Sequence, residues 1–393
     1  MSTLKVDAIR HNSATSDAIT TAADGTCTAK LTSVGGGQLS NRNIIINGAM
    51  TVAQRATSYT GADPFTTVDR YRLNHTGLNE DCTTAQADVA SGTAPYTNGF
   101  RKSFKVTNGN HTAGAGAGDR IAIQYRLEAQ DVANSGWNYV SSSSNITLQF
   151  WVKSSVAQNF FGTLKTSDGT SQNYPFETGS LSADTWTKIT KTIPGNSNLQ
   201  FDNNNEQGLQ IEFTLFRGTD QTGSVTLNQW AAFNSSTHTP DNTSTWYTTN
   251  DATFEITGLQ LEVGDTATSF EFRSFGEELF RCQRYYQKQQ NVTNQPFGVG
   301  NIDGSNQGQL HVKLTTTMRA KPTLETTGSA GDYGLRVRTT QTCTAVPVLP
   351  SQTAFTDSVF LEIPRSGHGF TDGQACFCVA INNNAFLAFN AEL

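Results

Sequence analysis

Side chains with catalytic or metal-binding chemistry are scattered along this chain. Its six histidines include no pair at the i,i+2 or i,i+4 spacing that metal sites use, so we expect surface or packing roles for them. The sequence has no Gly-x-Ser-x-Gly, His-Glu-x-x-His or Walker motif. Residues 113–118 alternate alanine and glycine but lack the lysine of a phosphate-binding loop. The motifs therefore predict no enzyme activity and no cofactor.

Two carboxylates can cleave a glycosidic bond when a fold holds both at a fixed separation. The chain has 33 Asp and Glu residues, but the sequence does not show which of them meet. Glu277 and Glu278 have a simpler role, because acidic side chains stabilise the start of a helix. Cleavage of a glycan by a depolymerase therefore stays open as a function, and an assay for new reducing ends would decide it.

Ring-bearing residues in polar, loop-like segments have the chemistry to contact sugars. Sugar faces stack on aromatic rings, while sugar hydroxyls bond to amides and carboxylates. The candidates are Trp137, Tyr139, Trp246, Tyr247 and His368, the last of these in a Gly-His-Gly turn. For Trp137 and Trp246 the alternative is that they cap a hydrophobic core.

The other three tryptophans are expected to have structural roles. Trp151 alternates with Phe150 and so points away from the apolar face of its predicted strand. We expect it to pack under a loop or against another subunit. Trp186 and Trp230 are expected in the core.

The composition is that of a polar but weakly charged surface. Charged residues make up 15% of the chain and the formal net charge is −6. No basic run exceeds two residues, which argues against nucleic-acid binding. No apolar run approaches the ~18 residues of a membrane helix. This composition is typical of extracellular β-proteins.

The first residues and the cysteines suggest where the protein is assembled. Residues 1–7 lack the basic and apolar pattern of a secretion signal. The six cysteines are irregularly spaced, which fits neither a zinc site nor a disulfide framework and favours buried free thiols. We therefore expect assembly in a cytoplasm, followed by release through lysis.

Alternating hydrophobicity predicts an all-β fold. Residues 146–152 and 209–215 alternate apolar and polar side chains, as half-buried strands do. The alternation changes phase at Gly258, which predicts a β-bulge there. Turn-forming clusters separate these runs, and many short strands of this kind predict a sandwich or jelly roll.

The predicted organisation has four parts. Residues 1–40 hold little apolar surface and form an extended N-terminal arm for attachment or trimerisation, with a turn at Asp24-Gly25. Residues 41–273 form a central jelly-roll β-sandwich. Residues 274–289 run from acidic to basic and form a short connecting helix. Residues 290–393 form a smaller C-terminal β-sandwich.

Several strings occur in a fixed order along the chain. They are Ser-Thr-Leu-Lys-Val-Asp at 2–7, Asn-Arg-Asn-Ile-Ile-Ile-Asn-Gly at 41–48, Val-Asp-Arg-Tyr at 68–71, Ile-Thr-Leu-Gln-Phe-Trp-Val-Lys-Ser-Ser at 146–155, Ile-Thr-Gly-Leu-Gln-Leu-Glu-Val-Gly at 256–264, Ala-Thr-Ser-Phe-Glu-Phe-Arg at 267–273 and Glu-Glu-Leu-Phe-Arg-Cys-Gln-Arg-Tyr-Tyr at 277–286. Together they resemble tail-fibre proteins of bacteriophages, cyanophage-like ones included, that carry a carbohydrate-binding type of jelly roll.

This resemblance implies a virion protein, a homotrimer whose arm docks on tail, adaptor or connector proteins and whose β-domains bind a host surface polysaccharide. It implies no nucleic-acid partner and no membrane insertion. Related sandwiches often carry a calcium-binding acid just after the Asn-Gly; here Ala49 and Met50 follow, so no metal is expected. A head-decoration or neck fibre with a structural role is the alternative from another class.

Overall fold

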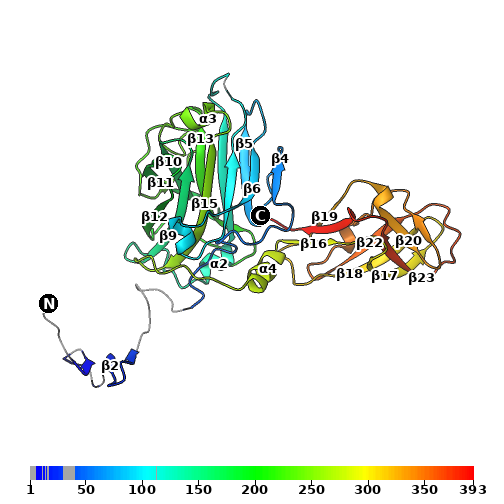
Figure 1. Ribbon diagram of the computed structural model, residues 1–393, viewed down its shortest axis with the longest axis horizontal. Coiled ribbons are helices and arrows are strands. Elements are labelled where there is room, and N and C mark those ends of the chain that lie inside the picture. Colours follow the sequence, from blue (N-terminus) through cyan, green and yellow to red (C-terminus); the bar gives the residue numbers. More distant parts are fainter. Residues whose placement is uncertain (1–5, 11, 14, 16, 30–39, 112) are drawn as a thin grey trace.

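Two β-domains and a small N-terminal sheet make up the described chain (Figure 1). The computed structural model describes residues 6–10, 12–13, 15, 17–29, 40–111 and 113–393. Residues 1–5 and 30–39 of the predicted arm lie outside this description. Because the described sheets are built from antiparallel strand pairs, the predicted all-β fold class is confirmed.

The described part of the arm forms a three-stranded sheet with strands β1 (Ala8–Ile9), β2 (Ile19–Thr21) and β3 (Cys27–Ala29). The predicted turn at Asp24-Gly25 joins β2 to β3. Gly25 has a φ of +86°, and the Asp24 carboxylate accepts a hydrogen bond from the Thr26 amide at 2.9 Å. Val6 and Ile9 are 42% and 55% exposed, so these apolar side chains face solvent in the single chain.

The central domain is a sandwich of two six-stranded sheets. The sheet named here the β13 sheet has the order β14 (Ala231–Ala232), β11 (Gln172–Ser180), β10 (Asn159–Thr166), β13 (Gln207–Arg217), β8 (Arg120–Glu128) and β5 (Tyr71–Thr76). The opposite β15 sheet has the order β12 (Thr187–Pro194), β9 (Asn145–Ser154), β15 (Thr253–Val263), β7 (Lys102–Thr107), β6 (Thr83–Asp88) and β4 (Ser58–Thr60).

The core lies between these sheets and follows the predicted alternation. Leu148 and Phe150 on β9 are fully buried, as are Leu209 and Ile211 on β13. The Phe150 ring packs edge-to-face on Phe213 of the other sheet, with 4.8 Å between ring centroids. The inward side chains of the two sheets therefore interdigitate as in other sandwiches.

The predicted bulge at Gly258 is confirmed. The pairing of β15 with β9 slips between Thr257 and Gln260, and Gly258 adopts a φ of +64°. That conformation favours glycine, because a Cβ atom would meet the following backbone. The bulge brings the residues that follow it back onto the correct face of the sheet.

In the described chain, short α-helices lie in or beside the sandwich at α1 (Ala94–Thr97), α2 (Ala129–Ala133), α3 (Thr245–Thr248) and α4 (Phe275–Gln283). The predicted connecting helix at 274–289 was too long. Ser274 caps α4 by accepting a hydrogen bond from the Glu277 amide at 3.3 Å, but the helix ends at Gln283. From Tyr286 the backbone instead forms strand bonds, which a continued helix would forfeit.

The C-terminal domain is a second, smaller sandwich. Its three-stranded sheet has the order β16 (Tyr286–Gln290), β24 (Phe386–Asn390) and β19 (Thr323–Thr326). Its six-stranded sheet has the order β21 (Thr340–Thr342), β20 (Tyr333–Arg336), β23 (Ala375–Ala380), β17 (Pro296–Asp303), β18 (Gln307–Lys313) and β22 (Ser358–Pro364). Short 3-10 turns occur at Ala330–Asp332 and Ser351–Thr353.

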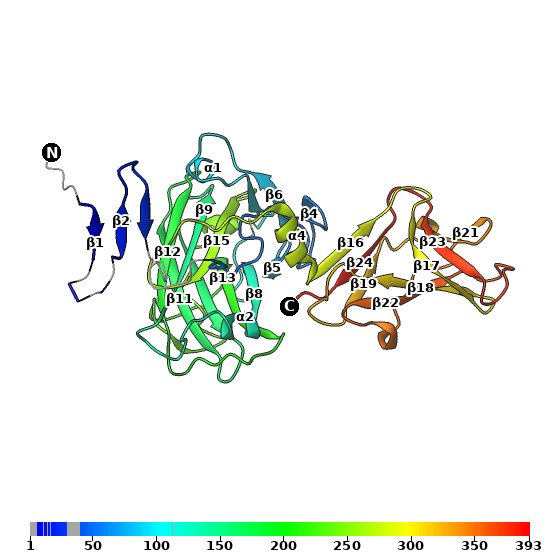
Figure 2. The ribbon, with the colours of Figure 1, turned by 90° about the horizontal axis from the view of Figure 1, so that it is seen from below.

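The end of the chain returns to the central sandwich, where Figures 1 and 2 place it near α4. Beyond β24, Glu392 forms ion pairs with Arg70 and, at 3.4 Å, with Arg55. The Arg126 guanidinium donates to the carbonyl oxygen of Leu393 at 2.8 Å. These contacts join the two β-domains through the chain end as well as through α4.

The cysteines with described side chains are buried and free, as predicted: Cys82, Cys282, Cys343, Cys376 and Cys378. Burial raises the pKa of the Cys82 and Cys343 thiols to about 12, which keeps both protonated and unreactive at neutral pH. Among the described helices, none is long and apolar enough to cross a membrane.

Candidate functional site

The tryptophans predicted to contact glycan are buried, and this prediction is wrong for both of them. Trp137 is 3% exposed and Trp246 is fully buried. Each indole Nε1 donates to a backbone carbonyl, Trp137 to Ser144 at 3.2 Å and Trp246 to Thr253 at 3.1 Å. A sugar cannot stack on rings whose faces are already covered by the core. Both residues cap the sandwich, which is the alternative that the sequence left open.

Tyr247 and His368 are also closed to a ligand. The Tyr247 ring lies between His111 and Phe216, with centroid distances of 4.6 and 4.4 Å. His368 is 3% exposed, stacks on Phe370, and its Nδ1 accepts a hydrogen bond from the Phe370 amide at 3.0 Å.

Tyr139 alone among the predicted contacts keeps an exposed part, because it is only half-buried. Its ring packs edge-to-face on Phe201 with 4.9 Å between centroids. The remaining tryptophans differ from one another as well. Trp230 is buried as predicted, but Trp186 is half-buried outside the core, where the Lys153 ammonium lies 5.1 Å from its ring.

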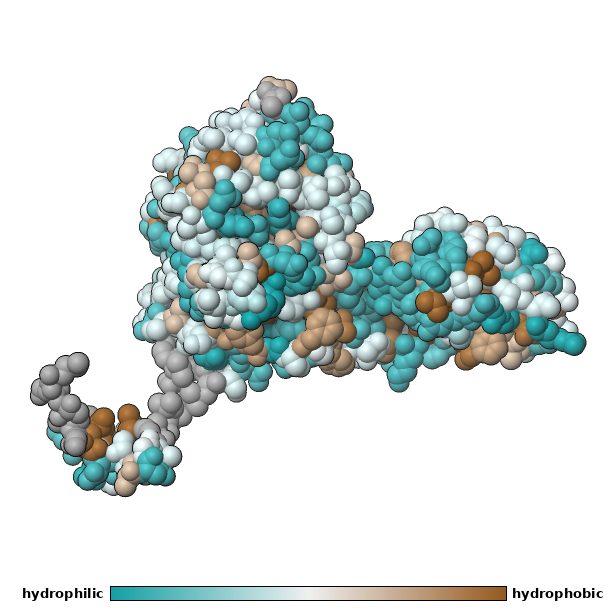
Figure 3. Space-filling model, viewed as in Figure 1, coloured by the Kyte–Doolittle hydropathy of each residue, from teal (hydrophilic) through white to brown (hydrophobic). Residues whose placement is uncertain are grey.

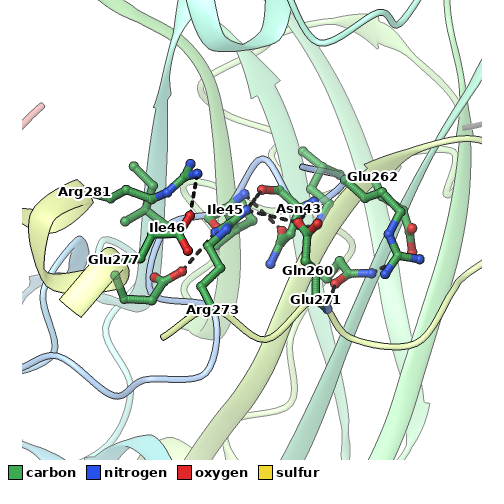
Figure 4. A network of polar contacts seen from close by, with 12 residues as sticks. Asn43, Ile45, Ile46, Gln260, Glu262, Glu271, Arg273, Glu277 and Arg281 are labelled. Atoms are coloured by element: carbon green, nitrogen blue, oxygen red, sulfur yellow. Dashed lines mark hydrogen bonds and ion pairs between the residues drawn. The ribbon is translucent and has the colours of Figure 1, made fainter. Parts of the chain in front are cut away.

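The strings that carry the tail-fibre resemblance meet in one polar network (Figure 4). The Asn43 Oδ1 accepts hydrogen bonds from the amides of Ile45 and Leu261. The Arg273 guanidinium donates to the carbonyl oxygens of Asn43 and Ile45 and pairs with Glu278 at 2.9 Å. The network therefore fixes the start of the sandwich to β15 and α4, which is an architectural role.

A loop crosses the outer face of the β15 sheet and is held there by buried side chains. The Glu262 carboxylate accepts from the Thr268 amide at 2.9 Å, and Gln149 donates its Nε2 to the Thr268 carbonyl at 2.7 Å. The Gln260 side chain accepts from the Glu271 amide at 2.8 Å. This anchoring places residues 267–272 beside β9.

The crossing loop encloses a pocket around Trp151, here called the Trp151 pocket, with a volume of about 470 Å³. Its apolar wall contains Trp151, which is half-buried, and Phe272, which is 51% exposed. Phe270 packs on Phe272 with 4.8 Å between ring centroids and holds that ring in place. The lining residues are Asn98, Phe100, Gln149, Trp151, Lys188, Gly258, Ala267, Thr268, Ser269, Phe270 and Phe272.

The polar groups of the Trp151 pocket suit a hydroxyl-rich ligand. Lys188 pairs directly with Trp151 across the strands β12 and β9, so its side chain lies on the same face. Amide and hydroxyl side chains of Asn98, Thr268 and Ser269 complete the lining. Exposed aromatic carbon beside short polar groups is the chemistry that sugars need, with ring stacking for their faces and hydrogen bonds for their hydroxyls.

The sequence predicted sugar contacts in loop-like segments, whereas Trp151 lies on strand β9. The available signal was the strand alternation itself, which puts Trp151 on the outer side of β9. The described part of the chain has no group of three or more His, Cys, Asp or Glu side chains placed to hold a metal ion.

No protein-family model matches the sequence, and no curated protein matches it. Solved structures with some similarity include the enzymatically active domain of bacteriophage CBA120 tailspike protein 4, at 8% identity and a TM-score of 0.29, covering 56% of this chain and 21% of that one. A family 4 carbohydrate-binding module has 11% identity and a TM-score of 0.28, with 56% and 99% covered. A family 11 module from Clostridium thermocellum, in complex with a mixed-linked tetrasaccharide, has 12% identity and a TM-score of 0.25, with 54% and 98% covered. With TM-scores this low, these similarities carry no functional argument.

Proposed function

We propose that this chain is a tail-fibre protein of a bacteriophage virion, a non-enzymatic homotrimer that binds a host surface glycan. It is assembled in the host cytoplasm. Residues 1–40 attach to tail, adaptor or connector proteins, and the β-domains present the glycan site to the host. The observation that carries the proposal is the Trp151 pocket, where exposed aromatic rings lie beside amide and hydroxyl groups.

Exposed apolar surface supports assembly into an oligomer. Phe275 and Phe280 are 61% and 53% exposed, and Figure 3 shows apolar side chains gathered over α4. Val6 and Ile9 of the arm are exposed as well. Contiguous apolar surface of this kind usually marks a protein interface. Copies of the chain that cover it would also raise the effective concentration of weak sugar sites.

The lining of the Trp151 pocket favours binding over hydrolysis. Among its described residues there is no Asp or Glu, whereas glycosidases place two carboxylates around the scissile bond. Incubation of the intact protein with a bound polysaccharide is expected to release no new reducing ends. Release of reducing ends would instead establish the depolymerase alternative.

A glycan array tests the binding proposal directly. The intact chain is expected to bind a discrete subset of glycans, and Trp151→Ala to weaken that binding by about tenfold or more, because a stacking face is lost. Trp186→Ala is the matched control, since it removes another half-buried tryptophan outside the pocket. Equal loss in both variants, or no loss in either, would refute the site.

A further inference from the structure

The outer face of the β13 sheet carries a cluster of four cationic side chains, here called the cationic face. Arg72 lies on β5, Arg120 and Arg126 on β8, and Lys165 on β10. All four alternate with inward core residues and are half-buried. Arg72 pairs with Gln124, and Gln210 pairs with both Arg126 and Lys165, so these three cations lie within a few strand spacings of each other, at about 4.8 Å per strand. Arg120 lies four residues before Gln124 on β8, about 13 Å along the strand at ~3.3 Å per residue.

Three of these cations have no acidic partner in the described chain. Arg72, Arg120 and Lys165 form no ion pair within 4.0 Å of a described Asp or Glu carboxylate. Arg126 is already engaged, because it donates to the Leu393 main-chain oxygen at 2.8 Å. The carboxylate that lies among them, Glu212, is already paired with Arg217, whose Nη2 and Nε donate to it at 2.6 and 3.1 Å. The cationic face therefore holds an excess of positive charge although the chain as a whole is acidic.

Burial and mutual repulsion disfavour the charged forms of these side chains. Burial and the neighbouring Arg72 lower the pKa of Arg126 to about 10. Burial lowers the pKa of Lys165, and burial together with Arg120 lowers the pKa of Arg72. A bound anion would relieve both the desolvation and the mutual repulsion of these groups.

Two buried amide oxygens on the same face also lack a partner. Gln124 is 4% exposed and donates its Nε2 to Glu212 at 2.7 Å, which leaves its Oε1 without a hydrogen bond. Asn173 is 5% exposed and donates its Nδ2 to the carbonyl oxygen of His238 at 3.0 Å, which leaves its Oδ1 without a hydrogen bond. Both oxygens are inaccessible from outside the chain, so they mark an unfavourable polar packing beneath the cationic face.

We propose that the cationic face is a second binding site, which takes an acidic polysaccharide. Carboxylate or sulfate groups of the sugar chain contact Arg72, Arg120 and Lys165. A polysaccharide fits better than a nucleic acid because the face spans too few cations for the dense phosphate charge of a nucleic acid. The inference goes beyond the aromatic contact proposed for the Trp151 pocket.

The test uses the intact chain and three probes: alginate as a polyuronate, dextran as a neutral polysaccharide and a single-stranded DNA oligonucleotide. The variant is Arg72→Gln/Arg120→Gln/Lys165→Gln, three residues for which the structure shows no ion pair. The control is Lys313→Gln/Lys321→Gln/Arg338→Gln, which removes the same charge from exposed positions of the C-terminal domain. Thermal unfolding of each variant confirms that it folds.

We expect alginate to bind the intact chain in a salt-dependent manner, and the Arg72/Arg120/Lys165 variant to bind it about tenfold or more weakly. The control variant and dextran binding should be unaffected. Equal weakening in both charge variants, or DNA binding as strong as alginate binding, would overturn the inference. Loss of alginate binding in Trp151→Ala alone would also overturn it while leaving the proposed function intact, so the two claims fail separately. If the triple variant does not fold, Arg72→Gln alone replaces it, and alginate binding that this variant leaves unchanged would overturn the inference.

Discussion

Glu392 shows how single buried charges hold this molecule together. It lies just beyond the last strand, yet its carboxylate pairs with Arg70 and Arg55 of the central sandwich. The Arg70 guanidinium also stacks over the Tyr285 ring at 3.3 Å. Burial opposes the charge on Arg70, but Glu392 raises its pKa above the usual range. The two β-domains are thus joined by an ion pair that is almost wholly desolvated.

Glu392→Gln is expected to lower the free energy of unfolding by about 3–5 kcal/mol, because it leaves a buried arginine without a counter-charge. Asp88→Asn is the matched control: it removes an exposed ion pair with Lys102 and should cost less than about 1 kcal/mol. Thermal or denaturant unfolding of both variants measures the difference. Equal effects would show that the Glu392 contact contributes no more than a surface pair.

Asp69 gives a prediction about pH. Burial raises the pKa of its carboxyl to about 6, although Gln54 donates to both of its oxygens. The pKa of an aspartate in an unfolded chain is about 3.9. Between pH of about 4 and 6 the folded protein therefore keeps Asp69 protonated while the unfolded chain does not, and this difference stabilises the fold. Above that range the buried carboxylate is charged and destabilises the fold. The stability of the wild type relative to Asp69→Asn should therefore fall by about 1–3 kcal/mol as pH rises through this window. Parallel pH–stability curves would contradict this.

At the scale of elements, the bulge in β15 is the feature that depends most on one residue. Gly258 has a positive φ, and a Cβ atom there would lie 2.6 Å from the Phe100 ring. The bulge lets the strand pass under the crossing loop that shapes the Trp151 pocket.

Gly258→Ala should destabilise the protein by about 2 kcal/mol or more, because strain and a steric clash add. Gly276→Ala is the control, since its Cβ would meet nothing within 4 Å and it lies in helix α4, where alanine is favoured. Chemical denaturation measures both. A neutral Gly258→Ala would show that the bulge relaxes easily.

The elements also show what the sequence can and cannot predict. Period-two alternation was sufficient to predict strands β9 and β13, and the phase slip at Gly258 predicted the bulge. Both are local patterns in the sequence. The end of α4 was not predictable, since strand pairing of Tyr286 with Asn390 is a contact across the chain. For the site, strand alternation places Trp151 on the outer side of β9, but whether a loop covers the ring of Trp151 or of Trp246 depends on contacts between distant parts of the chain.

At the scale of the whole molecule, the arm is a part whose apolar side chains are not buried within a single chain. Its described strands form a small sheet whose Val6 and Ile9 are exposed. We expect light scattering to give a trimer mass for the intact chain and weakened assembly for a chain of residues 41–393. A stable monomer for the intact chain at high concentration would count against the fibre proposal.

The affinity for a glycan-coated surface depends on both assembly and glycan binding. Surface-binding measurements would compare the intact chain with residues 41–393 on the same immobilised polysaccharide. If the arm multiplies weak contacts at the Trp151 pocket, the intact chain should bind about 100-fold more tightly than the shortened chain, and Trp151→Ala should reduce binding in both. Equal affinity of the two chains, or binding that Trp151→Ala leaves unchanged, would contradict the account.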